Sequence, residues 1–86
     1  MANSKIKLEY CILQVLKRKY SNAFEIENEL VNHKIKYNKK DFFPVLSHLF
    51  LNNHLCCNWV NNTGAKVKYY HITPIGVNFL NKGKVN

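Results

Sequence analysis

The sequence predicts an α+β fold in which three helices are followed by a two-stranded β-hairpin and a short fourth helix. Apolar residues recur at helical spacing in three segments before residue 53. Two runs of aromatic and β-branched residues then flank a polar linker that contains glycine. Finally, Thr73-Pro74 directly follows the second run, and a capping Thr before Pro at the first helical position favours a helix start.

The first helix is expected from about Ser4 to Tyr20. Its apolar residues cover an unusually wide arc of the helix surface. An arc of this width predicts packing on two sides, by its own domain and by a second copy of the chain. We therefore expect a homodimer, and its interface is predicted from the first and last helices: Ile6, Leu8, Ile12, Val15, Phe79 and Leu80.

The second helix is expected to begin near Asn22, which forms a capping-box-like pair with Glu25 three residues later. Glu25, Glu27 and Glu29 lie largely on the surface that its apolar face leaves free. Acidic side chains repel phosphate, so this helix is predicted to support the next helix and not to enter a DNA groove.

The third helix is expected from Asn38, a good cap, to Asn53, because Asn tolerates the left-handed backbone that often ends a helix. Asp41 falls at its third helical position. Phe43 and Leu51 are expected to be exposed. The core side is predicted from the three- and four-residue steps among Phe42, Val45, Leu46, Leu49 and Phe50.

The hairpin is predicted from strands at Leu55–Val60 and Val67–Ile72, joined by a six-residue tip, Asn61 to Lys66. Trp59 is expected to pack within the hairpin, and the alternative is that it stacks on a base. A last helix follows from Pro74 to about Asn81. Helix, helix, helix, hairpin, helix is the order of a winged helix-turn-helix. One domain is expected over residues 1–86, with a core at about 5–81 and a flexible tail at 82–86.

Charge favours a phosphate-rich partner. The 86 residues carry 13 Lys and Arg against 5 Asp and Glu, a formal net charge of +8, and no acid follows Asp41. Three cysteines, Cys11 and the adjacent Cys56-Cys57, do not suggest a disulfide framework and favour a reducing cytoplasm. Neither a signal peptide nor a membrane-spanning run is recognisable.

Three segments carry a family resemblance. They are NAFEI at the second helix, FFPVLSHLF (residues 42–50) and KYYHITPIG (residues 68–76). In this order and spacing they resemble the N-terminal domain of the PadR family of transcriptional regulators, over roughly Ile12 to Leu80. Phe43 replaces the Tyr usual in that family. Typical members continue after Leu80 into a dimerising region, so the resemblance implies a minimal form, and effector binding is not carried over.

In a winged helix the third helix, here about 38–53, enters the major groove and the wing, here 61–68, contacts the flanking backbone or minor groove. Lys40 and Ser47 are expected at base edges, and Lys39 and Asn38 at phosphate. Strand alternation leaves open whether Tyr69 or Tyr70 points outward. The predicted DNA contacts are Asn38, Lys39, Lys40, Phe43, Ser47, His48, Asn61, Asn62, Thr63, Lys66, Lys68 and Tyr70.

Catalytic residues, cofactors and metals are not predicted. Paired-carboxylate and Gly-rich phosphate-binding motifs are missing from the sequence, which argues against an enzyme. His54, Cys56 and Cys57 cluster, but adjacent cysteines on a strand point to opposite faces and do not easily bind one tetrahedral ion.

The predicted function is that of a small cytoplasmic repressor that binds double-stranded DNA sequence-specifically, as a homodimer on a pseudo-palindromic site, and is associated with the nucleoid when bound. One alternative is a plasmid or phage segregation or maintenance protein that binds repeated DNA sites. Another is a winged-helix adaptor that binds protein. The cationic second half of the chain favours DNA over the adaptor.

Overall fold

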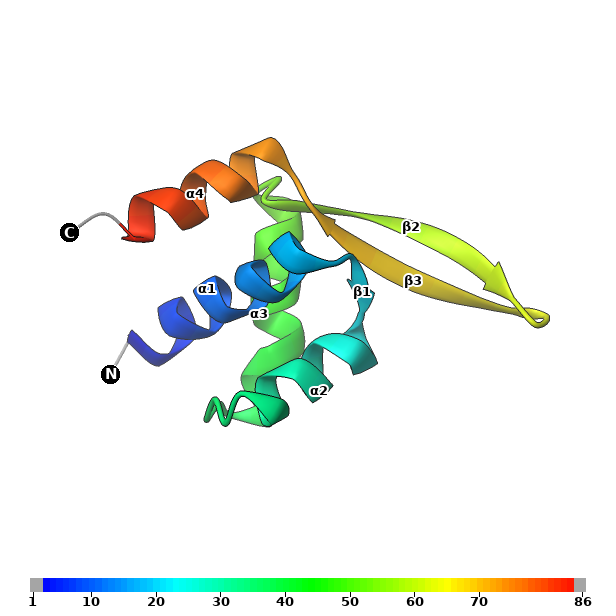
Figure 1. Ribbon diagram of the computed structural model, residues 1–86, viewed down its shortest axis with the longest axis horizontal. Coiled ribbons are helices and arrows are strands. Elements are labelled where there is room, and N and C mark those ends of the chain that lie inside the picture. Colours follow the sequence, from blue (N-terminus) through cyan, green and yellow to red (C-terminus); the bar gives the residue numbers. More distant parts are fainter. Residues whose placement is uncertain (1–2, 85–86) are drawn as a thin grey trace.

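The computed structural model describes residues 3–84, with the side chains of residues 3–5, 62, 83 and 84 excepted. The fold is the predicted α+β winged helix, with one additional short strand. The elements in chain order are α1 (Asn3–Arg18), β1 (Ser21–Asn22), α2 (Ala23–Asn32), α3 (Lys39–Leu51), β2 (Leu55–Asn62), β3 (Ala65–Ile72) and α4 (Pro74–Lys84). Figure 1 shows the helices gathered at one end and the β2–β3 hairpin, the wing, projecting from them.

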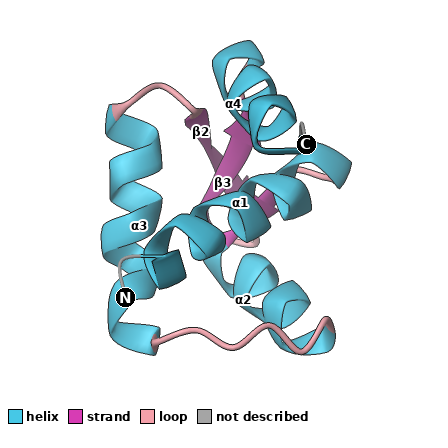
Figure 2. Cartoon of the chain, turned by 90° about the vertical axis from the view of Figure 1, so that its left-hand side faces the viewer, coloured by secondary structure: helices cyan, strands magenta, loops and turns pink. Residues whose placement is uncertain are grey.

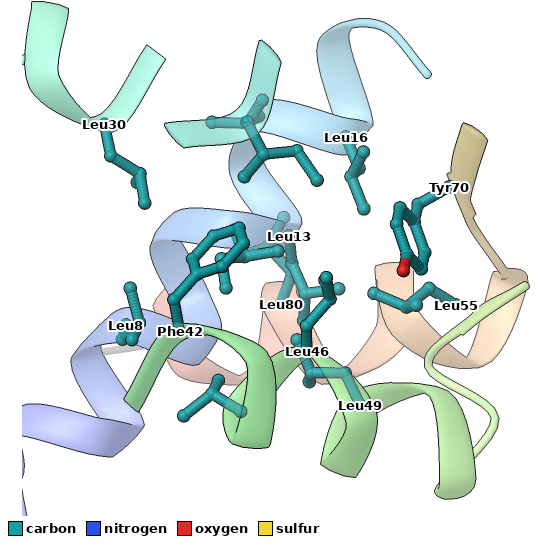
Figure 3. Close-up of a cluster of buried hydrophobic side chains, with 14 residues drawn as sticks. Leu8, Leu13, Leu16, Leu30, Phe42, Leu46, Leu49, Leu55, Tyr70 and Leu80 are labelled. Atoms are coloured by element: carbon teal, nitrogen blue, oxygen red, sulfur yellow. The ribbon is translucent and has the colours of Figure 1, made fainter. Parts of the chain in front are cut away.

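Helix α1 forms the centre of the molecule, with α2, α3 and α4 around it (Figure 2). The core is one cluster of apolar side chains, shown in part in Figure 3. Helix α3 contributes four buried residues spaced three and four apart, which fixes its opposite side toward solvent. The core comprises Leu8, Ile12, Leu13, Val15, Leu16, Ile26, Leu30, Phe42, Val45, Leu46, Leu49, Leu55, Tyr70 and Leu80.

The wide apolar arc of α1 is therefore used within a single chain. Four residues predicted at a dimer interface are core residues, and that prediction is wrong for Leu8, Ile12, Val15 and Leu80, which are 0–6% exposed. A helix surrounded by three others must be apolar on most of its surface, so the arc does not require a second copy. Of the same set, Ile6 is 47% exposed.

The predicted helix caps are confirmed. The Asn22 side chain accepts a hydrogen bond from the Glu25 amide at 2.8 Å, and the Asn22 amide donates to the Glu25 carboxylate at 3.1 Å. The Asn38 side chain accepts from the Lys40 amide at 3.1 Å. At the end of α3, Asn53 has φ +63, and its amide donates back to the Phe50 carbonyl at 3.0 Å.

Two helix ends differ from the prediction. Helix α1 stops at Arg18, since Ser21 and Asn22 pair with Tyr70 and Tyr69 of β3 as an edge strand. A two-residue strand has no alternation that sequence reasoning can detect. Helix α4 continues to Lys84, so the predicted tail from residue 82 begins within a helix, and residues 85–86 lie outside the described residues.

The wing is longer and its turn tighter than predicted. The sheet order is β1-β3-β2, all antiparallel, and the β2–β3 register runs from Leu55 opposite Ile72 to Asn62 opposite Ala65. The turn is only Thr63-Gly64, with φ +49 and φ +82, the positive values that a tight two-residue hairpin turn requires. The predicted six-residue tip is therefore wrong, because the polar residues beside the turn pair as strands.

The start of α4 is fastened to the end of α3 through Thr73. Its hydroxyl donates to the Asn53 carbonyl at 2.6 Å and accepts from the Gly76 amide at 3.0 Å, which caps α4 as predicted. A Cβ added at Gly76 would overlap the His54 carbonyl oxygen. The absence of a side chain at Gly76 thus lets the start of α4 pack directly against the backbone of His54. Within residues 3–84, no helix has the length and apolar character needed to cross a bilayer.

Candidate nucleic-acid interface

The outward side of α3 carries most of the predicted DNA contacts. Because its inward residues are buried in the core, Lys40, Phe43, Ser47 and Leu51, spaced three and four apart, form an exposed row that we call the outer stripe. Phe43 is 58% and Leu51 76% exposed, as predicted. Lys39 is also exposed, in the first turn of the helix.

The wing presents one of its faces toward α3. Strand alternation and the register place Trp59, Asn61, Lys66 and Lys68 on this face. The Lys68 ammonium nitrogen lies 5.7 Å from the centre of the Phe50 ring of α3. It lies 5.8 Å from the Trp59 ring centre and 5.5 Å from that of Tyr70. The wing face and the outer stripe of α3 are therefore adjacent.

A hollow of about 60 Å³ marks the junction of α3 and the wing. It is lined by Phe43, Leu46, Ser47, Phe50, Lys68 and Tyr70. Lys40 and Lys66 are exposed on the two sides of this junction, one on the helix and one on the wing. The outer stripe and the wing face, which carry these two lysines, therefore meet at this hollow.

Tyr70 is not a surface residue. It is 9% exposed and belongs to the core, so its predicted DNA contact is wrong. Tyr69 points to the opposite face of the sheet, where its ring lies edge-on to Tyr20, with centroids 5.7 Å apart. Tyr70 is buried because it packs in the core with residues from other elements, which periodicity alone does not reveal.

Two aromatic residues were assigned the wrong environment. Trp59 is 63% exposed on the wing and does not pack inside the hairpin. Phe50, predicted on the core side of α3, is 42% exposed beside Lys68. The contact of Trp59 and Phe50 with Lys68 could have been found from the hairpin register, because Trp59 lies directly opposite Lys68.

The remaining predicted contacts differ in their surroundings. His48 faces α1, where its Nε2 lies 3.7 Å from a carboxylate oxygen of Glu9, an acid that repels phosphate. The Asn38 side chain serves as the cap of α3. Asn61 is exposed on the wing and Thr63 lies at its tip, whereas the side chain of Asn62 lies outside the described residues.

The acidic residues of α2 are held by neighbouring groups. Glu27 accepts a hydrogen bond from the Tyr37 hydroxyl at 3.0 Å. Glu29 lies 3.3 Å from both the Arg18 guanidinium and the His33 imidazole. No acid occurs in the sequence of the wing, so its charge is entirely positive.

Perturbed pKa values fall on two groups away from this interface. Burial raises the pKa of the Cys11 thiol, and nearby Lys7 opposes that effect. The pKa of Tyr37 is raised by burial and then by its hydrogen bond to Glu27. Within the part of the chain that the structure describes, no three His, Cys, Asp or Glu side chains gather to hold a metal ion.

Comparison with known proteins places this arrangement in a family. No family model matches the sequence, and no curated protein does. Among solved structures, a PadR-like transcription factor from Bacteroides fragilis is 31% identical, with a TM-score of 0.82, over 93% of this chain and 79% of that one. A PadR-like transcriptional regulator from Bacillus cereus is 26% identical, with a TM-score of 0.82, over 98% and 84%.

A third similar structure is that of Bacillus subtilis PadR in complex with operator DNA. It is 19% identical, with a TM-score of 0.79, and the match covers 92% of this chain and 47% of that one. Fold and interface together define a winged-helix protein with a cationic wing beside an exposed helix. The chain belongs to the PadR-like family of transcriptional regulators, as its three sequence segments predicted, and this is not a family of enzymes.

Proposed function

We propose that the chain is a repressor that binds double-stranded DNA sequence-specifically. Helix α3 enters the major groove, and the wing contacts the flanking backbone or minor groove. The observation that carries this proposal is that α3, with exposed Lys40, and the wing, with exposed Lys66, meet where Lys68 contacts Phe50. The similar structure of Bacillus subtilis PadR is a complex with operator DNA, which supports DNA as the partner.

Within this proposal the contacts divide by chemistry. Lys40 and Ser47, on the outer stripe, contact base edges, whereas Lys39 at the start of α3 binds phosphate. On the wing, Lys66 binds phosphate and Asn61 supplies an amide to the backbone or the minor groove. Lys68 is partly buried among aromatic rings, so it orients the wing more than it neutralises phosphate.

The protein acts as a homodimer on a pseudo-palindromic operator in the cytoplasm and is associated with the nucleoid when bound. Two copies would place two α3 helices in major grooves about 34 Å apart. The apolar side chain of Ile6 on α1 remains available for the contact between copies. Sedimentation equilibrium of the chain alone and with DNA tests this stoichiometry, and a 1:1 complex with monomeric protein would contradict it.

A gel-shift assay at about 50 mM salt, followed by footprinting on the DNA upstream of the protein's own gene, tests the proposed function. A repressor protects one pseudo-palindromic site. Protection of an array of repeats would favour the segregation alternative. If no duplex is bound, the exposed aromatic groups of α3 and the wing would instead favour the protein adaptor.

A further inference from the structure

The outer stripe of α3 is unusually apolar for a helix that enters a DNA groove. The stripe begins at Lys40 and ends at Leu51. Between these two residues, its polar group is the Ser47 hydroxyl. The Phe43 ring and the Leu51 side chain are 58% and 76% exposed. Arg, Asn and Gln, whose side chains make paired hydrogen bonds to guanine or adenine, are absent from this stripe.

The position of Phe43 is well defined. Its ring lies edge-on to Phe42, with centroids 5.1 Å apart, and Phe42 is fully buried. Phe43 also lines the hollow between α3 and the wing, next to Ser47. A rigid apolar group is therefore held at the surface, beside the helix centre.

In the major groove, thymine alone presents a methyl group, beside its O4 acceptor, whereas the other bases present only polar groups to recognition there. An apolar side chain placed against those donors and acceptors leaves them without partners, which is costly. We propose that Phe43 and Leu51 recognise thymine methyl groups, so that the operator has A·T pairs opposite these two residues. This inference rests on the proposed function and specifies the DNA that it selects.

Charge identifies the occupant of the stripe as DNA. Lys39 and Lys40 lie at one end of it and the cationic wing lies beside it. The chain carries a net charge of +8, and no acid follows Asp41. Lys39 at the start of α3 and Lys66 on the wing would hold phosphates of the duplex, which brings the bases against Phe43 and Leu51.

The test begins with duplexes selected by the wild-type protein from a random-sequence pool. We expect thymine at fixed positions of the selected site. Deoxyuridine then replaces each of those thymines, which removes the methyl group and keeps the base pair. Each methyl removed from contact is expected to weaken binding about fourfold. A duplex of unselected sequence, which is bound through its backbone, is expected to lose no affinity on the same replacement.

Two variants locate the effect. In Phe43→Ala, the ring that contacts the methyl group is missing. Deoxyuridine replacement is therefore expected to change the affinity of this variant little. Phe24→Ala is the matched control, since Phe24 is 71% exposed on α2, outside the stripe, and this variant should keep the full loss. The wild-type comparison does not depend on the folding of either variant.

The outcomes separate the inference from the proposed function. Tight, selective binding that is unchanged by deoxyuridine would overturn methyl recognition and leave the proposed function intact. A selected site without thymine at fixed positions would do the same. Failure to bind any duplex would overturn both.

Discussion

The ammonium group of Lys68 in β3 lies 5.7 Å from the centre of the Phe50 ring in α3. This distance is within the range of a cation–π interaction. Trp59 and Tyr70 place their ring centres at 5.8 and 5.5 Å from the same nitrogen. One cation thus lies between the wing and the helix.

Replacing Lys68 by Met is expected to weaken binding to a selected duplex by about two- to fivefold, the value of one partly exposed cation–π contact. Because the proposed role of Lys68 is to position the wing, the slope of log affinity against log salt should change little. Lys68→Arg should keep most of the affinity. A slope that falls by about one in Lys68→Met would show instead that Lys68 neutralises a phosphate.

Trp59 provides a direct optical probe, since it is the only tryptophan in the chain and is 63% exposed on the wing face. We expect solvent-exposed emission in the free protein. Duplex DNA should shift the emission or quench it, because the wing face lies against the duplex in the proposed complex. Unchanged Trp59 emission at saturating DNA would contradict the proposed position of the wing.

Gly76→Ala is expected to destabilise the fold by about 1–3 kcal/mol, because the added methyl group would overlap the His54 carbonyl oxygen and force α4 to move. Helix propensity alone predicts the opposite sign, since Ala exceeds Gly by about 1 kcal/mol within a helix. Urea unfolding measures the change. The matched control is Asn78→Ala, at an exposed site of the same helix, which should be neutral or stabilising.

The cysteines are expected to differ in reactivity. Burial raises the pKa of the Cys11 thiol, so a smaller fraction is thiolate near pH 8, and its reaction should require a higher pH. Cys56 is exposed and should react first with a disulfide reagent. Mass spectrometry of partly labelled protein identifies the order. In denaturant the cysteines should react at equal rates. Equal rates of labelling for Cys11 and Cys56 in the folded protein would contradict the burial of Cys11.

Local hydrogen-bond chemistry made several features predictable from the sequence. Asn22, Asn38, Asn53 and Thr73 each bond to backbone groups within a few residues, so their roles as caps follow from short segments. The family segments include two of these caps, Asn22 and Thr73, and the buried row of α3. The order of helices and strands could therefore be predicted.

Features that depend on distant segments could not be predicted. The strand at Ser21–Asn22 exists because Tyr69 and Tyr70 offer it an edge. Tyr70 is buried by residues from other elements, and the apolar arc of α1 is covered by α2, α3 and α4 within one chain. Helical periodicity shows which residues share a face and not what covers that face.

The central claim is that Lys39 at the start of α3 and Lys66 on the wing, both exposed, bind the phosphates of one duplex together. The most direct test is the salt dependence of duplex affinity for Lys39→Ala, Lys66→Ala and the double variant. Lys82→Ala is the charge-matched control, because Lys82 lies in the last turn of α4, and the C-terminal end of that helix points away from the wing (Figure 1). The log–log slope should fall by about one for each single variant and about two for the double variant, and stay unchanged for the control. Equal slopes in all four variants would contradict the claim.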